Sequence, residues 1–188
     1  MSTDLQSVPA APAPSSPSRP AARLRALTVS RAPARPTPAA AVHTLASATS
    51  VLLLLVAIGA AFNEPLLIPP LVASAALIHS VPTLPLAQPR SVIGGHLLCA
   101  VVGLTVHAMF GSSLWTAGVA ASLALGTTML ARTPHSPACA TAVIAVLQGP
   151  APARFLATLT GAAGLLVIAG LLAARLRRNA PAYPSYWW

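Results

Sequence analysis

Residues 41–62 read AVHTLASATSVLLLLVAIGAAF and decide the fold class of this chain. The run contains no Asp, Glu, Lys or Arg, and as a helix it is long enough to cross an apolar bilayer core of about 30 Å. Similar sequence continues to residue 174, interrupted by four charges only, at Glu64, Arg90, Arg132 and Arg154. Charged residues make up 7% of the 188-residue chain, against about 25% in soluble domains. The sequence therefore excludes a water-soluble fold and predicts a polytopic membrane protein.

Six apolar segments follow one another after residue 40. Two of them are shorter than the rest and begin with proline, at residues 65–80 and 137–147. The other four are long enough to span a bilayer, and they cover residues 41–62, 91–110, 114–131 and 154–176. We expect an all-α transmembrane helical bundle with four full spans and two short, proline-led half-helices.

The two short segments resemble each other. PLVASAAL at residues 70–77 and PACATAVI at residues 137–144 share the pattern P-x-x-A-[S/T]-A-x-[L/I]. The long segments flank them in the same order, so we predict an internal two-fold repeat of residues 41–110 and 114–176. The alternative is a chance alignment of alanine-rich sequence.

The arginines bear on the topology, because positive residues concentrate on the cytoplasmic side of a membrane. If all six segments cross, Arg154 alone lies opposite the two termini. If the short segments are re-entrant, Arg90, Arg132 and Arg154 all lie there. The charge distribution favours six crossings with both termini in the cytoplasm. The Arg-only, Ala- and Pro-rich composition predicts the plasma (inner) membrane of a bacterium.

Both ends of the chain are expected to lie outside the membrane domain of residues 41–178. Residues 1–40 are rich in Pro, Ala and Arg and show no apolar periodicity, which predicts a disordered basic tail facing anionic lipids in the cytoplasm. An organelle transit peptide is the minor alternative. Residues 179–188 form an aromatic tail. Its rings suit the headgroup level of a membrane, and they belong to Tyr183, Tyr186, Trp187 and Trp188.

Several function classes are excluded by what the sequence lacks. It has no P-loop, no dinucleotide fingerprint and no paired carboxylates, so we expect no enzyme and no cofactor. The basic residues lie in the tail and at helix ends with little aromatic interleaving, which argues against a nucleic-acid partner. Cys99 and Cys139 lie inside apolar segments, and we expect small buried thiols rather than a metal site.

Three prolines are expected to begin helices within the membrane, namely Pro69, Pro70 and Pro137. The N-terminus of a helix exposes unpaired N–H groups and a partial positive charge. Two such ends facing one another would form a site for a small anion. The alternative is that the breaks only shorten helices for packing.

Polar side chains accompany these prolines. Ser74 and Thr141 occupy equivalent positions one turn into each short helix, and their hydroxyls can line a polar path or bond to a carbonyl one turn earlier. His135 precedes the second short helix. It is the best candidate for a substrate contact or proton carrier, with a hydrogen-bonded linker histidine as the alternative. His96 and His107 share a helix face but lie too far apart for one metal ion.

Small residues repeat at four-residue spacing in two of the long segments. We interpret both stripes as helix-packing faces, and they consist of Gly95, Cys99 and Gly103, and of Gly118, Ser122 and Gly126. A chain this small is expected to form homo-oligomers, and the second stripe is the expected contact.

Three runs of residues resemble the HPP family of integral membrane proteins. The longest is LPLAQPRSVIGGH at residues 84–96, which contains Gln88, Pro89, Arg90, Gly94, Gly95 and His96. PLLIPP at residues 65–70 with ASA at 73–75, and YPSYW at 183–187, are similar to the same family. The resemblance covers residues 41–187.

The resemblance implies four membrane-spanning helices, and some plastid and cyanobacterial members are associated with nitrite transport. The family is named after a His-Pro-Pro motif followed by A-G-A-T-A. Here the motif reads His135-Ser136-Pro137, and Cys139 stands at the family glycine. If the motif shapes the transport path, these two departures alter it.

Together these observations predict a transporter or channel for a small inorganic anion such as nitrite. A non-transporting membrane scaffold or accessory subunit is the main alternative. A sensor that uses its basic tail to bind a cytoplasmic partner is a third possibility.

Overall fold

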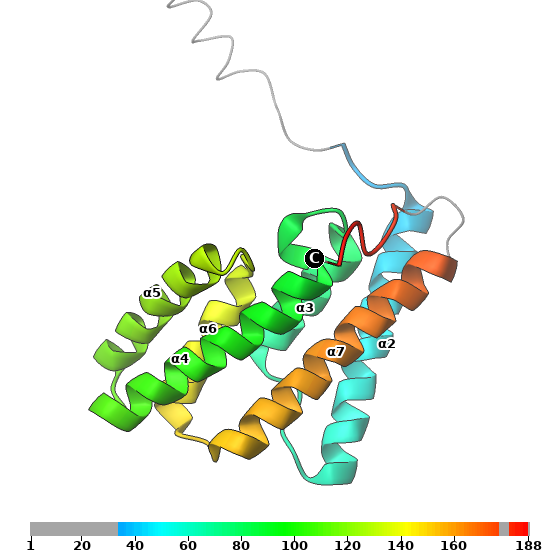
Figure 1. Cartoon of the computed structure of the whole chain (residues 1–188). Coiled ribbons are helices and arrows are strands. Elements are labelled where there is room, and N and C mark those ends of the chain that lie inside the picture. Colours follow the sequence, from blue (N-terminus) through cyan, green and yellow to red (C-terminus); the bar gives the residue numbers. More distant parts are fainter. Residues whose placement is uncertain (1–33, 177–180, 188) are drawn as a thin grey trace, which may run out of the picture. The chain divides into compact units, whose positions relative to one another are not determined.

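The computed structural model describes residues 34–176 and 181–187. The chain divides into two units, Met1–Pro36 and Thr37–Trp188. Every regular element described is helical and belongs to the second unit (Figure 1). The elements are α2 (Pro38–Phe62), α3 (Pro69–Ser80), the 3₁₀ turn η1 (Pro85–Ala87), the π-helical turn η2 (Arg90–Gly94), α4 (Gly95–Phe110), α5 (Leu114–Leu130), α6 (Ser136–Gln148) and α7 (Pro152–Leu176). The predicted all-α class is confirmed.

Local chemistry sets the first helix boundaries. Thr37 caps α2, since its hydroxyl accepts a hydrogen bond from the Ala40 N–H at 3.2 Å. Pro38 follows in the first turn, where a missing N–H costs nothing. The last three residues of the predicted tail, 38–40, therefore belong to α2, while residues 1–33 lie outside the described part of the chain. Asn63 ends α2 in a left-handed conformation with φ 54°.

Three helices within the described residues are long and apolar enough to cross a membrane: Pro38–Phe62, Arg90–Phe110 and Pro152–Leu176. The second is α4 with η2 as its first turns. Helix α5 has 17 residues and belongs with the shorter apolar helices. The sequence predicted a fourth full span at residues 114–131. The helix ends at Leu130, just before the predicted end, and Arg132 follows with φ 58°.

One end of the bundle gathers the start of α4, the end of α5 and the C-terminal tail. Arg90 donates a hydrogen bond from its guanidinium to the Ala131 carbonyl at 3.0 Å. The Ser185 N–H donates to the Gln88 side-chain oxygen at 2.8 Å. We call this end, where α3, α5 and α7 finish, the Arg90 end (top of Figure 1).

The opposite end gathers the α2–α3 link and the α6–α7 link. Glu64 forms an ion pair with Arg154 there, and Ser112, just before α5, donates to the Leu147 carbonyl at 3.1 Å. We call this the Glu64 end. Each helix from α2 to α7 therefore runs from one end to the other, antiparallel to the helix before it (Figure 1).

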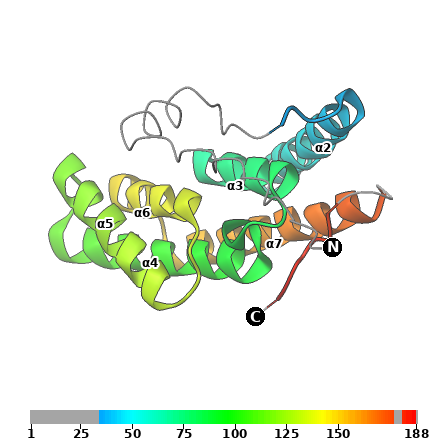
Figure 2. The same ribbon diagram turned by 90° about the horizontal axis from the view of Figure 1, so that it is seen from above.

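Two apolar clusters form the core. The helices α4, α5 and α6 pack on one another, whereas α3 contacts α2, α6 and α7 (Figure 2). The first cluster is alanine-rich and draws on α4, α5 and α6, and the second draws mainly on α2, α3 and α7. Helix α3 thus joins the two halves of the bundle.

The two stripes of small residues have different surroundings. A Cβ on Gly103 would lie 2.5 Å from the Ala142 carbonyl oxygen, and one on Gly95 would lie 2.8 Å from the Cβ of His135. The first stripe is therefore a packing face between α4 and α6. Gly118 and Gly126 have nothing within 4 Å of an added Cβ, so the second stripe faces outward from the described part of the bundle.

Candidate functional site

Four polar side chains from three helices and one link converge where the two apolar clusters meet. They are Ser74 of α3, His96 of α4, Thr141 of α6, and His135, which immediately precedes α6. None is more than 1% exposed. Burying four polar groups in an apolar environment is costly unless they satisfy one another, and in a membrane-spanning chain such groups are functional candidates.

Short hydrogen-bonding distances connect the four side chains. Ser74 Oγ lies 2.8 Å from His96 Nε2 and 2.7 Å from His135 Nε2. The other nitrogen of His96, Nδ1, lies 2.8 Å from Thr141 Oγ1. The two imidazole rings meet edge to face with centroids 5.0 Å apart. We call this set, Thr141–His96–Ser74–His135, the histidine chain.

The direction of these hydrogen bonds follows from one acceptor. His135 Nδ1 lies 2.6 Å from the Leu86 carbonyl oxygen, and a carbonyl only accepts, so Nδ1 carries a hydrogen. In neutral His135, Nε2 has no hydrogen and can accept from the Ser74 hydroxyl, whose other acceptor is the Pro70 carbonyl at 2.9 Å. When the hydroxyl donates to His135, the rest of the chain follows. His96 Nε2 donates to Ser74, and His96 Nδ1 accepts from Thr141. The neutral chain is thus oriented from Thr141 toward Leu86.

Glycines allow the backbone to approach closely enough for this geometry. Gly95 stands beside His96, and the space of its missing side chain is taken by His135. Gly94 faces the Thr133 side chain, whose nearest carbon would lie 3.4 Å from an added Cβ. The π-helical turn Arg90–Gly94 precedes them. Such turns within helices are frequent at functional sites.

The C-terminal tail supports the Leu86 carbonyl. Tyr183 donates from its hydroxyl to the Ala87 carbonyl at 3.0 Å, and the Gln88 amide donates to the carbonyls of Pro82 and Leu84 at 2.8 and 3.0 Å. Tyr183 is 5% exposed, and its burial raises the pKa of the phenol. The Tyr183 ring therefore packs inside the bundle beside Gly170 and does not face lipid or water. Tyr186 and Trp187 are exposed; Trp188 lies outside the described residues.

The helix N-termini have their donors engaged locally. Pro69 and Pro70 have no N–H, and the next two donors, Leu71 and Val72, both bond to the Ile68 carbonyl at 3.0 and 3.2 Å. Pro137 lacks an N–H as well, and the Ala138 N–H bonds to the His135 carbonyl at 3.0 Å. In this conformation the α3 terminus has no free N–H among the donors of its first turn. A ligand here would therefore contact the hydroxyls and imidazoles, in place of their bonds to one another.

The residues that carry the family resemblance surround the histidine chain. Pro89 immediately precedes η2, Arg90 bonds to the end of α5, and His96 is in the histidine chain itself. Gln88 is fully buried and connects the η1 region to the tail through Ser185. Among the positions of the family's His-Pro-Pro motif, His135 is part of the histidine chain. Ser136 begins α6, and Cys139 is a half-buried free thiol.

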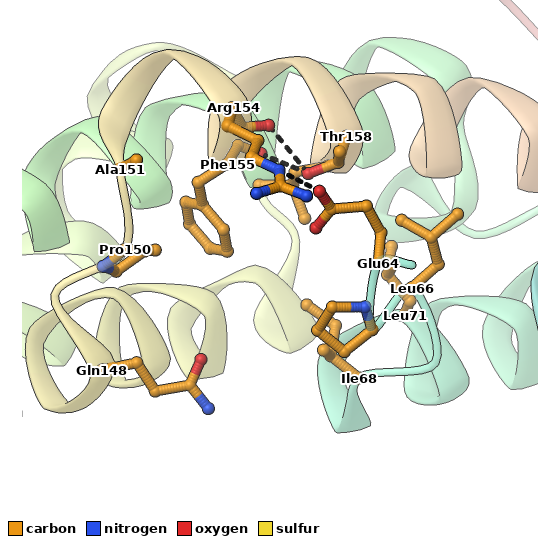
Figure 3. Close-up of a pocket in the computed structure, with 12 residues that line it drawn as sticks. Glu64, Leu66, Ile68, Leu71, Gln148, Pro150, Ala151, Arg154, Phe155 and Thr158 are labelled. Carbon is orange, nitrogen blue, oxygen red and sulfur yellow. Dashed lines mark hydrogen bonds and ion pairs between the residues drawn. The ribbon is translucent and has the colours of Figure 1, made fainter. Parts of the chain in front are cut away.

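A cavity of about 230 Å³ opens at the Glu64 end (Figure 3). The Glu64–Arg154 ion pair lies at it, with Phe155 and Ile68 on its walls. Leu71 also lines this cavity, is buried, and sits one turn before Ser74 on the same side of α3. Leu71 thus lies between the cavity and the histidine chain.

One further buried hydroxyl lies near the chain. Thr133 Oγ1 has no hydrogen-bond partner among the described residues, although the residue is 6% exposed. An unpaired buried hydroxyl costs roughly 1–3 kcal/mol. A ligand that lies against the extended segment just before α6 can therefore contact this hydroxyl. Within the described part of the chain, no three His, Cys, Asp or Glu side chains are grouped to hold a metal ion.

Ser74, His135 and Thr141, the polar side chains predicted from the sequence as site residues, lie together in the structure. Their connection to His96 was not predicted, because the sequence pointed to His96 only through the family resemblance and the helix face that it shares with His107. His96 bonds directly to Ser74 and Thr141. The available signal was its ionisable side chain within an apolar span. Its partners could not be found, since they lie 22 and 45 residues away.

The fold and the buried polar chain define a small multi-pass helical membrane protein. Residues 33–184 match the family described as "HPP, transmembrane region". The match covers most of the sequence, and this chain belongs to that family. It is an integral membrane protein.

Two proteins of Dictyostelium discoideum, each named only as a transmembrane protein, are similar to this chain. One is 35% identical over 125 residues, which cover 62% of this chain and 43% of the relative. The other is 32% identical over 125 residues, which cover 62% of this chain and 40% of the relative. The chain thus matches less than half the length of either relative. No solved structure matches it.

Proposed function

We propose that this protein transports a small monovalent anion, such as nitrite, across the membrane. The observation that carries the proposal is the fully buried histidine chain in an otherwise apolar core. Two hydroxyls and two imidazoles at one place can coordinate an oxyanion. Nitrite is the first anion to test, because the family resemblance implies it.

The proposed topology has six crossings. Helix α3 has 12 residues and α6 has 13, so each is about 20 Å long. Each helix is preceded by an extended segment, residues 64–68 before α3 and 133–135 before α6, which completes the crossing. A re-entrant α3 would place the end of α2 and the start of α4 at one end of the bundle. They lie instead at the Glu64 end and the Arg90 end, which supports six crossings and an inverted two-fold repeat.

The charges orient this topology. Arg90, Arg132 and Arg175 belong to the Arg90 end, whereas Arg154 at the Glu64 end is paired with Glu64. The positive-inside rule then places the Arg90 end, with both termini, in the cytoplasm. The plasma membrane of a bacterium remains the proposed location.

The enclosure of the chain favours a carrier over an open channel. Ser74, His96 and Thr141 have no exposed surface, and Leu71 lies between them and the cavity. An anion would enter beside Arg154 and reach Ser74, Thr141 and His135 when the helices rearrange. Pro69, Pro70 and Pro137 lie in the first turns of the short helices α3 and α6, which are the helices that would move. Homo-oligomers through the outward face of Gly118, Ser122 and Gly126 are part of the same proposal.

The second candidate is a non-transporting scaffold or accessory subunit. One observation favours it: the histidine chain is closed and hydrogen-bonded internally, as expected of a purely structural polar cluster. A scaffold requires no passage for ions, so transport measurements separate the two candidates.

The test is nitrite influx into proteoliposomes at alkaline pH, where little neutral nitrous acid is present to cross the lipid unaided. We expect influx above that of empty vesicles, competed by formate or nitrate. His135→Gln should abolish it. The matched control His43→Gln, whose ring is hydrogen-bonded to the Ala173 carbonyl at 3.1 Å, should retain it. Wild-type protein that is folded but gives no influx would favour the scaffold.

A further inference from the structure

We propose that the histidine chain binds one exchangeable proton, held on His135, and that the anion crosses together with this proton. The inference rests on the proposed function and deepens it. It assigns the protein to proton-coupled symport of the anion of a weak acid. It is carried by the geometry of five contacts and the number of hydrogens available to fill them.

The histidine chain has five contacts at hydrogen-bonding distance. Four are the contacts of Ser74 with His96 and His135, of His96 with Thr141, and of His135 with the Leu86 carbonyl. The fifth joins Ser74 Oγ to the Pro70 carbonyl at 2.9 Å. With both histidines neutral, the two hydroxyls and two rings supply four hydrogens in all. One contact of the neutral chain is therefore without a hydrogen.

The unfilled contact of the neutral chain is the one to Pro70. The Ser74 hydroxyl has one hydrogen. In the neutral chain it donates that hydrogen to His135 Nε2, which carries no hydrogen and can only accept. If one proton is added to His135, Nε2 donates to Ser74 instead. The Ser74 hydroxyl then turns to the Pro70 carbonyl, and all five contacts are filled. The heavy atoms are thus already placed for the protonated state.

Protonation of His96 fits less well. Its Nδ1 would then donate to Thr141, and the Thr141 hydroxyl would lose its acceptor in the chain, while the Pro70 contact would stay unfilled. A buried hydroxyl without a partner costs about 1–3 kcal/mol. Protonated His135 donates directly to the Leu86 carbonyl and to Ser74, which in turn donates to the Pro70 carbonyl. His135 is therefore the proton site.

The groups around His135 limit the chain to one proton. The titratable group that faces it is His96 of α4, with ring centroids 5.0 Å apart, so a second charge would be repelled. Cys99 follows one turn later on α4, and Cys139 lies on α6 itself. Helix α3 contributes the Ser74 hydroxyl and η1 contributes the Leu86 carbonyl. Helix α5 has no titratable residue, and the Arg90 guanidinium of η2 bonds to Ala131.

Proton binding acts on the first turn of α3. The Ser74 hydroxyl bonds to Pro70 only in the protonated state, and Pro70 precedes Leu71, which lines the cavity at the Glu64 end. Protonation of His135 thus affects the turn of α3 that carries Leu71, the residue between the cavity and the histidine chain. One positive charge on His135 also compensates the charge of a monovalent anion in a medium where an isolated ion is costly.

The first experiment observes the histidines directly, without transport. ¹⁵N-histidine NMR of the purified full chain in lipid nanodiscs distinguishes the ring nitrogens, and His→Gln variants assign the signals. Above about pH 8 we expect the Nδ1–H form at His135 and the Nε2–H form at His96. On acidification His135 should gain one proton while His96 stays neutral. Protonation of His96 first, or of neither ring before the protein unfolds, would overturn the proposal.

Ser74 variants test the role of the hydroxyl. Ser74→Ala removes the acceptor for His135 Nε2–H, so His135 should remain neutral at pH values where the wild-type ring is protonated. Ser74→Thr retains the hydroxyl and should restore the titration. Ser80→Ala is the matched control, since its hydroxyl likewise bonds one turn back, to Ala76, but is exposed. Identical titration in Ser74→Ala and wild type would count against the rotating hydroxyl.

The second experiment measures coupling in proteoliposomes that contain a pH-sensitive dye. A nitrite gradient should acidify the interior beyond the level of empty vesicles, and clamping the voltage with K⁺ and valinomycin should leave the rate unchanged, since one proton accompanies each anion. Anion influx that is sensitive to voltage and leaves the dye unchanged would refute coupling while leaving the proposed transport intact. Absence of any influx, with normal His135 titration, would reject the transport function but support the proton site.

Discussion

Ser74 and Thr141 bond to opposite nitrogens of one imidazole. Ser74 Oγ lies 2.8 Å from His96 Nε2, and Thr141 Oγ1 lies 2.8 Å from His96 Nδ1. The two hydroxyls occupy matching positions of the two proline-led helices, in the shared pattern P-x-x-A-[S/T]-A-x-[L/I]. A single histidine between α3 and α6 thus holds the two short helices together.

Removing the Thr141 hydroxyl should weaken this connection. In Thr141→Val the side-chain volume is nearly kept, but His96 Nδ1 loses its donor inside the core. We expect a loss of roughly 1–3 kcal/mol in the free energy of unfolding, and recovery in Thr141→Ser. Urea or thermal unfolding in detergent measures both. Thr105→Val is the control, because that hydroxyl is exposed and bonds only to Val101; equal losses at the two sites would contradict the buried contact.

Gly95 should not tolerate a side chain. A Cβ there would lie 2.8 Å from the Cβ of His135, so Gly95→Ala must push the α6 lead away from α4. Overpacking of this kind costs about 1–3 kcal/mol, and nitrite influx should fall with it. Gly164→Ala, which has nothing within 4 Å of the new methyl group, should instead be neutral or stabilising. A stable and active Gly95→Ala protein would show that the packing is looser than described.

Tyr183 should act on the histidine chain through η1. Tyr183→Phe leaves the Ala87 carbonyl without its donor, and we expect about 0.5–1.5 kcal/mol lower stability. Tyr183→Ala should cost about 3–5 kcal/mol, as for other large buried rings. Because Leu86 accepts from His135 next to this contact, both changes should also shift the His135 NMR signal. The exposed Tyr186→Phe serves as the control and should leave stability and the signal as they are.

The ion pair of Glu64 and Arg154 should matter for the anion more than for stability. The Arg154 side chain is 64% exposed, and exposed pairs contribute only about 0–1 kcal/mol. Arg154→Gln should therefore unfold at nearly the wild-type temperature but show a higher KM for external nitrite, since the positive charge at the cavity is gone. Glu64→Gln should lower KM by releasing that charge. Opposite changes of KM in the two variants are the decisive result; parallel changes would remove the cavity from the path.

Six crossings make a specific labelling prediction. Leu84→Cys and Ala151→Cys, each in a chain whose two native cysteines are replaced by alanine, place one thiol at each end of the bundle. An impermeant maleimide added outside intact cells should label position 151 and leave position 84 unlabelled until the membrane is opened. Labelling of both positions from outside would require re-entrant short helices and four crossings.

The sequence alone determined the membrane class and the approximate place of every helix described. Both follow from local properties: long runs without charge can only be buried in lipid, where the backbone must form helices to satisfy its own polar groups. Proline at the start of α3 and near the start of α6 marked their N-termini for an equally local reason. Helix α5 ends at Leu130, just before the predicted end, and hydropathy does not reveal the positive φ of Arg132 that follows it.

Only the tertiary structure decided what these helices bring together. Ser74 and His135 are 61 residues apart in the sequence, and their contact depends on close packing permitted by Gly95 and on the antiparallel order of α3 and α6. The burial of Tyr183 likewise depends on the place where the tail returns to η1. Hydropathy records the preference of each residue for lipid or water, whereas the pairing of polar groups depends on which helices become neighbours.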